Sequence, residues 1–188
     1  MKINKRLFDI FFSIFAIILL FVPFIIISIL IKFNSKGPIL FFSKRVGFKN
    51  KIFVMPKFRT MKEGSNEIET DLFKDNDNIT SIGRLLRRYS LDELPQFYSV
   101  LIGDMSIVGP RPCLESQKEL IYQRNKHGIN NLYPGITGFA QINGRDNISI
   151  DQKINYELNY KEKLSLIFDI KIIFLTIIKI MQKKDIKH

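Results

Sequence analysis

Two acidic residues stand side by side in the middle of the chain, where Asp92 is followed directly by Glu93. Arg111 follows them between two prolines, and arginines also cluster just before the pair: Arg84, Arg87 and Arg88. A carboxylate among arginines keeps a depressed pKa, so it stays ionised and can act as a nucleophile or bind a metal ion. The guanidinium fork also fits the oxygens of a phosphate group. These residue types favour chemistry on a phosphate-bearing substrate.

The same stretch also has a purely structural explanation. Ser90-x-x-Glu93 is a capping box, which starts a helix without any chemistry, but Pro95 would then lie beyond the first turn and cost a hydrogen bond. If Asp92 is the cap instead, Pro95 lies in the first turn, where its missing N–H costs nothing. That register places a carboxylate at a helix N-terminus, a position that also favours phosphate. The local pattern leaves both explanations open.

The chain is strongly basic, with 188 residues, a formal net charge of +11 and a pI of about 9.7. Its length supports one domain with a core. Its charge favours a polyanionic partner: nucleic acid, anionic lipid or a phosphate-bearing substrate. Cys113 is the only cysteine, which excludes an internal disulfide, and it cannot build a zinc site with the two distant histidines.

The N-terminal segment, residues 1–36, is predicted to be a re-entrant membrane helix. From Ile10 to Ile31 the chain is almost wholly apolar and long enough to span a bilayer. Pro23 should kink or break a helix in its middle, and the positive-inside rule places the basic flanks at both ends on the cytoplasmic face. A single span remains an alternative. A signal peptide is disfavoured, because no small-x-small cleavage site follows.

Residues 37–188 are predicted to form a mostly α-helical, cytosol-facing domain with a small β-hairpin. The hairpin strands are expected at Ile39–Phe42 and Lys51–Met55, and the acidic stretch Glu63–Asn78 is expected to be a solvated loop, a candidate lid. Helices are expected at Thr80–Arg88, Leu94–Leu101, Asp151–Lys163 and Leu164–Met181. The last of these has one narrow polar face, so it is predicted to lie in a membrane interface, with a core helix as the alternative.

Taken together, the motifs resemble those of the small monotopic phosphoglycosyl transferases, which are bacterial sugar transferases. The matching blocks are Lys5-Arg6-x-x-Asp9, Lys57-Phe58-Arg59-Thr60-Met61, Ser90 to Gln96, Gly103-Asp104-Met105-Ser106, Gly109 to Pro112, Pro134-Gly135-x-Thr137-Gly138, Gln141-x-x-Gly144-Arg145 and Ser165-x-x-x-Asp169. Each block alone is weak evidence, but the ordered series is specific.

The resemblance implies a two-step reaction. The Asp92 carboxylate attacks the β-phosphate of a UDP-sugar, UMP leaves, and undecaprenyl phosphate then takes the phosphosugar from the enzyme. A covalent carboxylate step of this kind splits one hard displacement into two easier ones. Glu93 is implied as the second member of a catalytic dyad and Mg²⁺ as a cofactor bound beside Asp92. The expected donor is N-acetylated.

The resemblance also implies roles for further residues. Phosphate or nucleotide binding is expected for Lys57, Arg59, Arg88, Arg111, Arg145 and Glu157, and membrane anchoring for Lys5, Arg6, Asp9 and Pro23. Two positions depart from the family pattern, because Val22 stands where a serine usually precedes the proline, and Glu157 stands where an aspartate is usual. The implied location is the cytoplasmic face of the bacterial inner membrane. The expected partners are membrane lipid and both substrates, without nucleic acid, and a homo-oligomer is left open.

A rival hypothesis explains the charge and the apolar ends without catalysis. A basic module anchored to a membrane could bind lipid or nucleic acid through the same residues. A third hypothesis is a transferase-like protein that has lost its activity. Substitution of Asp92 separates the first two, because it should abolish transfer but leave binding unchanged, and UDP-sugar turnover identifies an inactive relative.

Overall fold

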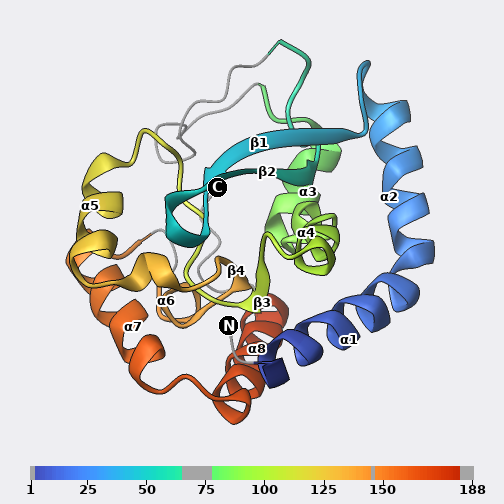
Figure 1. Cartoon of the computed structure of the whole chain (residues 1–188). Coiled ribbons are helices and arrows are strands. Elements are labelled where there is room, and N and C mark those ends of the chain that lie inside the picture. The colour runs from blue at the N-terminus through green and yellow to red at the C-terminus, as the bar shows by residue number, and fades with distance from the viewer. Residues whose placement is uncertain (1–2, 65–77, 145–146, 183–188) are drawn as a thin grey trace.

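The computed structural model describes residues 3–64, 78–144 and 147–182. Its chain begins with two helices that form a bent arm, α1 (Ile3–Leu19) and α2 (Phe21–Asn34) (Figure 1). The two helices are bent by 60° relative to each other, and the break falls at Leu20. Pro23 accounts for the break, because it has no N–H for the Leu19 carbonyl and its ring crowds that group. The predicted break near Pro23 is confirmed.

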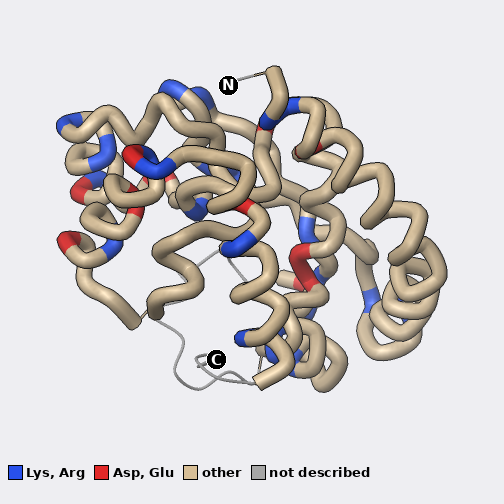
Figure 2. The backbone as a smooth tube through the Cα atoms, turned by 90° about the horizontal axis from the view of Figure 1, so that it is seen from below, with Lys and Arg blue, Asp and Glu red and all other residues tan. Residues whose placement is uncertain are grey.

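The arm is apolar between its ends. Its charged residues lie near the start of α1 or near the end of α2: Lys5, Arg6, Asp9 and Lys32. In Figure 2 most of the blue and red segments, which mark the charged residues, lie outside the arm. No single helix in the described ranges is both long and apolar enough to cross a bilayer, whereas the bent pair meets that criterion when its two helices are taken together.

Two small sheets follow. Strands β1 (Leu40–Val46) and β2 (Ile52–Phe58) form an antiparallel hairpin closed by the 3-10 turn Phe48–Asn50, which confirms the predicted hairpin with longer strands. Strands β3 (Ser106–Val108) and β4 (Gly135–Thr137) pair in parallel.

The rest of the described chain is mostly helical, as predicted. Its helices are α3 (Ser81–Arg88), α4 (Gln96–Ile102), α5 (Lys118–Lys126), α6 (Phe139–Ile142), α7 (Ile150–Glu162) and α8 (Leu166–Gln182), with 3-10 turns at Leu91–Glu93 and Ile129–Asn131. The Thr80 hydroxyl caps α3 by accepting from the Gly83 N–H at 2.9 Å. The predicted loop at Glu63–Asn78 lies almost entirely outside the described residues.

Helix α4 packs against the arm and leads into the core. Arg6 of α1 donates to the carbonyls of Val100 and Leu101 at 2.6 and 2.7 Å, where it satisfies acceptors at the end of α4. Val100, Met105 and Val108 belong to the largest buried cluster, which also holds Ile172 of α8. The core therefore joins the arm, the parallel strands and α8.

Helix α8 turns two of its polar residues inward. Asp169 is fully buried, and the Thr176 hydroxyl lies 2.7 Å from that of Thr137 on β4. Apart from Lys171 and Gln182, its exposed residues are large and apolar: Ile167, Ile170, Phe174, Ile177 and Met181. A helix of a water-soluble protein has the opposite arrangement.

Candidate active site

The Asp92–Glu93 pair lies in the 3-10 turn between α3 and α4. Ser90 adopts a left-handed conformation with φ 54°, so the chain turns sharply before the pair. Asp92 and Glu93 are only 9% and 7% exposed. Ser90 makes no side-chain capping bond, and Pro95 rather than Asp92 directly precedes α4. The capping box is therefore not formed, and Asp92 lies inside the 3-10 turn rather than at the cap of α4.

Two cations meet on one oxygen of Glu93. Lys57 of β2 donates to Glu93 Oε1 at 3.2 Å, and Arg111 of the loop after β3 donates to the same oxygen at 3.1 Å. The side chains of Lys57 and Arg111 are 17% and 28% exposed, so both cations remain partly accessible from solvent. The fold thus brings together residues distant in sequence into a partly open, cationic site suited to phosphate.

Arg87 of α3 belongs to the arginine cluster noted before the acidic pair, although it was not among the residues assigned to phosphate binding by the resemblance. Its Nε donates to the Thr60 hydroxyl at 2.9 Å. Burial lowers the pKa of Arg87, and the charge of the Asp92 carboxylate opposes that effect. Arg87 lies four residues after the buried Gly83, so helical spacing places it on the inward face. That spacing was the signal available in the sequence.

Arg88 and Arg59 do not join the Glu93 cluster. Arg88 is exposed and lies 5.9 Å from the ring centre of Tyr89. Arg59 is 6% exposed and donates to the Ser35 carbonyl at 2.8 Å and to the Lys36 carbonyl. These carbonyls directly follow α2, so the contacts of Arg59 tie the end of the arm to the hairpin. Phosphate binding by these two arginines stays a prediction.

Glu157 is 2% exposed and bound to Arg124 of α5. Its Oε2 accepts from Arg124 Nε at 2.8 Å, and its Oε1 accepts from Arg124 Nη2 at 2.5 Å. Burial acts to lower the pKa of Arg124, but the Glu157 carboxylate raises it above its ordinary value. The contacts of Glu157 thus place it in a buried ion pair rather than at the Glu93 cluster. Arg145 lies outside the described residues.

Lys5 and Asp9, predicted as membrane-anchoring residues, contact the protein interior. Lys5 donates to Asp169 of α8 at 2.7 Å and to the Val108 carbonyl at 3.1 Å. Asp9 accepts from the Ser106 hydroxyl at 2.8 Å and from the Ile107 N–H at 3.1 Å. These contacts fix the start of the arm to β3 and α8.

Tyr160 of α7 completes this buried network. Its hydroxyl lies 2.7 Å from Asp169 Oδ1 and 3.1 Å from the Val108 carbonyl oxygen, and its single proton is donated to the Asp169 carboxylate. Burial and the Asp169 charge raise the pKa of Tyr160, so its hydroxyl stays neutral and donates. Lys5 and Tyr160 thus hold the backbone at Val108, three residues before Arg111.

The carboxylates of the dyad fit a magnesium ion whose other ligands come from the substrate and from water. Magnesium that acts on phosphates is commonly held by one or two carboxylates, with waters and substrate oxygens as the other ligands. Asp92 supplies such a carboxylate. Within the described ranges, no group of three or more histidine, cysteine or acidic side chains could hold a metal by itself.

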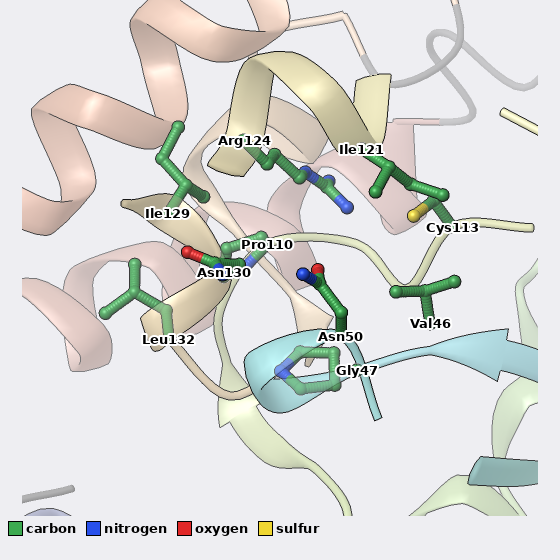
Figure 3. Close-up of a pocket in the computed structure, with 11 residues that line it drawn as sticks. Val46, Gly47, Asn50, Pro110, Cys113, Ile121, Arg124, Ile129, Asn130 and Leu132 are labelled. Atoms are coloured by element: carbon green, nitrogen blue, oxygen red, sulfur yellow. The ribbon is translucent and has the colours of Figure 1, made fainter. Parts of the chain in front are cut away.

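A small cavity lies behind the Arg111 loop. Its volume is about 20 Å³, room for about one water molecule. Pro110, Cys113 and Arg124 line it, whereas Asp92 and Glu93 do not (Figure 3). The cavity is too small for a sugar nucleotide and belongs to the packing of the loop against α5.

Lysine and arginine groups beside a nearly buried carboxylate pair suit the transfer of a phosphate-bearing group, and here the pair lies in a helical domain with an apolar arm. Comparison with known proteins places that class in a family. A sequence model of the bacterial sugar transferases matches residues 1–183, so this chain belongs to the bacterial sugar transferase family.

Several curated proteins are similar over most of this chain. The exopolysaccharide production protein ExoY of Sinorhizobium fredii is 36% identical over 191 residues, covering 93% of this chain and 84% of ExoY. The uncharacterized sugar transferase EpsL of Bacillus subtilis is 37% identical over 186 residues, covering 99% of this chain and 91% of EpsL. The UDP-glucose:undecaprenyl-phosphate glucose-1-phosphate transferase of Escherichia coli is 38% identical over 187 residues, covering 95% of this chain but 40% of that longer protein.

Proposed function

We propose that this protein transfers a sugar 1-phosphate from a UDP-sugar to undecaprenyl phosphate at a membrane surface. The observation that carries the proposal is the placement of Lys57 and Arg111 on Glu93, directly beside Asp92. The family match and the named activity of the Escherichia coli relative support the same reaction class. The reaction would begin the assembly of a membrane-linked glycan.

The proposed chemistry proceeds by two displacements at one phosphorus atom. An Asp92 carboxylate oxygen attacks the β-phosphorus of the UDP-sugar, and the bond from that phosphorus to the bridging oxygen breaks, so UMP leaves. A phosphate oxygen of undecaprenyl phosphate then attacks the same phosphorus, and the aspartyl bond breaks. Asp92 is the nucleophile, while Lys57 and Arg111 neutralise charge on the phosphoryl oxygens. Glu93 holds these two cations in position.

Magnesium is proposed as the cofactor on the chemistry of the donor set. Asp92 would hold it together with diphosphate oxygens of the donor. When bound, the ion would supply charge neutralisation for the leaving UMP. Arg87 adds a positive charge that interacts with the Asp92 carboxylate.

We also propose that the arm enters and leaves the membrane from one side, the cytoplasmic face. A straight helix from Ile3 to Asn34 would run about 48 Å at 1.5 Å per residue, well beyond a hydrocarbon core of about 30 Å. The arm instead bends by 60°. Lys5 fixes its start, and Arg59 fixes its end, to the same domain. Both ends therefore lie against that domain, and the exposed apolar elbow between them faces lipid.

The identity of the sugar is a separate part of the proposal. The resemblance favours an N-acetylated donor, whereas the relatives named by substrate include glucose-1-phosphate transferases and a galactosyl transferase. A donor panel must therefore include UDP-glucose, UDP-galactose and their N-acetylated counterparts, because a few pocket contacts decide such preferences.

The decisive experiment measures UMP release by detergent-purified protein with magnesium over that panel, with and without undecaprenyl phosphate. A covalent intermediate predicts that one donor gives a stoichiometric UMP burst without acceptor, and that the intact protein gains the mass of a phosphosugar. Asp92→Asn should lose the burst, whereas the exposed control Asp151→Asn should keep it. UMP release that requires acceptor from the first turnover would contradict the covalent step. No release by folded protein across a broad panel would favour the binding module.

A further inference from the structure

The loop that carries Arg111 has few backbone donors. Pro110 and Pro112 lack N–H groups, so this segment cannot be fixed by an ordinary strand ladder. It is held through its carbonyls instead. The Pro110 carbonyl accepts from the Gly135 N–H at 2.9 Å, and the Arg111 carbonyl accepts from Arg124 Nη2 at 3.0 Å. The Cys113 carbonyl accepts from the Val46 N–H at 2.9 Å, so the bond from Arg124 is the one of these three that holds the backbone of Arg111 itself.

Arg124 can make that bond because Glu157 fixes its guanidinium. The two side chains meet fork to fork, at 2.8 and 2.5 Å, and are 7% and 2% exposed. Two parallel bonds set the plane of a guanidinium as well as its position. Figure 3 shows Arg124 extending from α5 toward the loop that bears Pro110 and Cys113. A rigid connection thus runs from α7 through α5 to the Arg111 backbone.

We propose that Arg124 and Glu157 are positioning residues, which aim the Arg111 guanidinium at Glu93 and at the donor phosphate by fixing the Arg111 carbonyl. This inference rests on the proposed function for its catalytic consequence, but not for its structural part. It gives Glu157 an indirect role, since no contact joins it to the Lys57–Glu93–Arg111 cluster among the bonds of the described residues.

The first test is a mutant cycle that separates positioning from general stability. The charge-neutral double variant Arg124→Met/Glu157→Gln avoids leaving one buried charge unpaired. Its kcat/KM for the UDP-sugar should fall about 10- to 100-fold, the usual cost of misplacing a reacting or supporting group. In an Arg111→Ala background the same change should cost less than about twofold, because its target is gone. Equal losses in both backgrounds would overturn the proposal.

The second test measures the loop without using turnover. Cys113 is the only cysteine, lies two residues after Arg111 and is 3% exposed. Burial raises the pKa of its thiol, whereas Arg124 lowers it and Glu157 raises it. A thiol reagent such as DTNB should therefore modify the native protein slowly, and the charge-neutral double variant removes the two opposing charge effects together. Releasing the loop in Arg124→Met/Glu157→Gln should increase the modification rate about tenfold or more.

The control for lost stability is Ile27→Ala, because Ile27 is a buried residue of α2 that belongs to a separate hydrophobic cluster. If DTNB modifies Cys113 no faster in the double variant than in Ile27→Ala at matched thermal stability, the proposal is overturned. Faster modification together with a wild-type protein that releases no UMP would support the positioning of the loop and reject the proposed function. The two readouts therefore distinguish failure of the inference from failure of the function.

Discussion

At the scale of single residues, Glu93 and Asp92 are adjacent acids with different surroundings. Glu93 accepts from Lys57 and Arg111 through the same oxygen, so its negative charge holds two cations close together, both of which are proposed to bind phosphate. It also competes with a substrate phosphate for those groups. Its main effect should therefore be on orientation in the transition state rather than on affinity for the donor.

The variant Glu93→Gln tests that role. Removing the charge leaves Lys57 and Arg111 more attractive to a diphosphate but less well oriented, so kcat should fall about 100-fold without a rise in KM. Steady-state kinetics of UMP release measure both constants, with the exposed Glu119→Gln as the matched control. An increase in KM at unchanged kcat would instead mean that Glu93 contributes uniform binding.

The sequence motifs predicted part of this site. They identified Asp92, Glu93, Lys57 and Arg111, and the fold brings these four residues together. The same reasoning did not place Glu157, because its partner Arg124 lies in a helix whose pattern is merely polar. A buried ion pair leaves no periodic signal in a sequence.

At the scale of elements, local pattern predicted the hairpin and the helices α3, α4, α7 and α8, but not the inward-facing polar side of α8 or the parallel pairing of β3 with β4. Strands of three residues have too little periodicity to reveal a distant partner. The orientation of α8 depends on the medium around it, because an apolar stripe packs inward in water and outward in lipid.

The arm gives a prediction about topology. In sealed vesicles with the cytoplasmic face outward, Ile3→Cys and Lys36→Cys should both react with a membrane-impermeant maleimide, since both ends of the arm are tied to one domain. The unmodified chain gives the background, because Cys113 is buried. Labelling of one position while the other needs detergent would show a single span.

Pro23→Ala restores a donor for the Leu19 carbonyl and should protect Ile3→Cys from the maleimide in part of the population, because a straighter arm is long enough to span the bilayer.

At the scale of the whole molecule, two forces act toward a membrane. The net charge of +11 attracts anionic lipid. The exposed apolar residues of the arm and α8 can be buried only in lipid or against another apolar surface, and Phe174 and Ile177 are 63% and 51% exposed. The Lys5–Asp169 pair joins α1 to α8, so the arm and α8 are linked at this point.

The two forces respond differently to salt, which gives the last prediction. At about 1 M salt the Debye length is about 3 Å, so attraction between surface charges is screened while apolar burial persists. The wild-type protein should therefore stay in the membrane pellet at high salt and leave it only with detergent. Phe174→Glu/Ile177→Glu places charge on the apolar face of α8 and should increase the salt-released fraction, whereas Tyr122→Glu, at a similarly exposed aromatic on α5, should not. Release of the wild-type protein by salt alone would contradict this prediction and show that charge, rather than apolar burial, holds the protein at the surface.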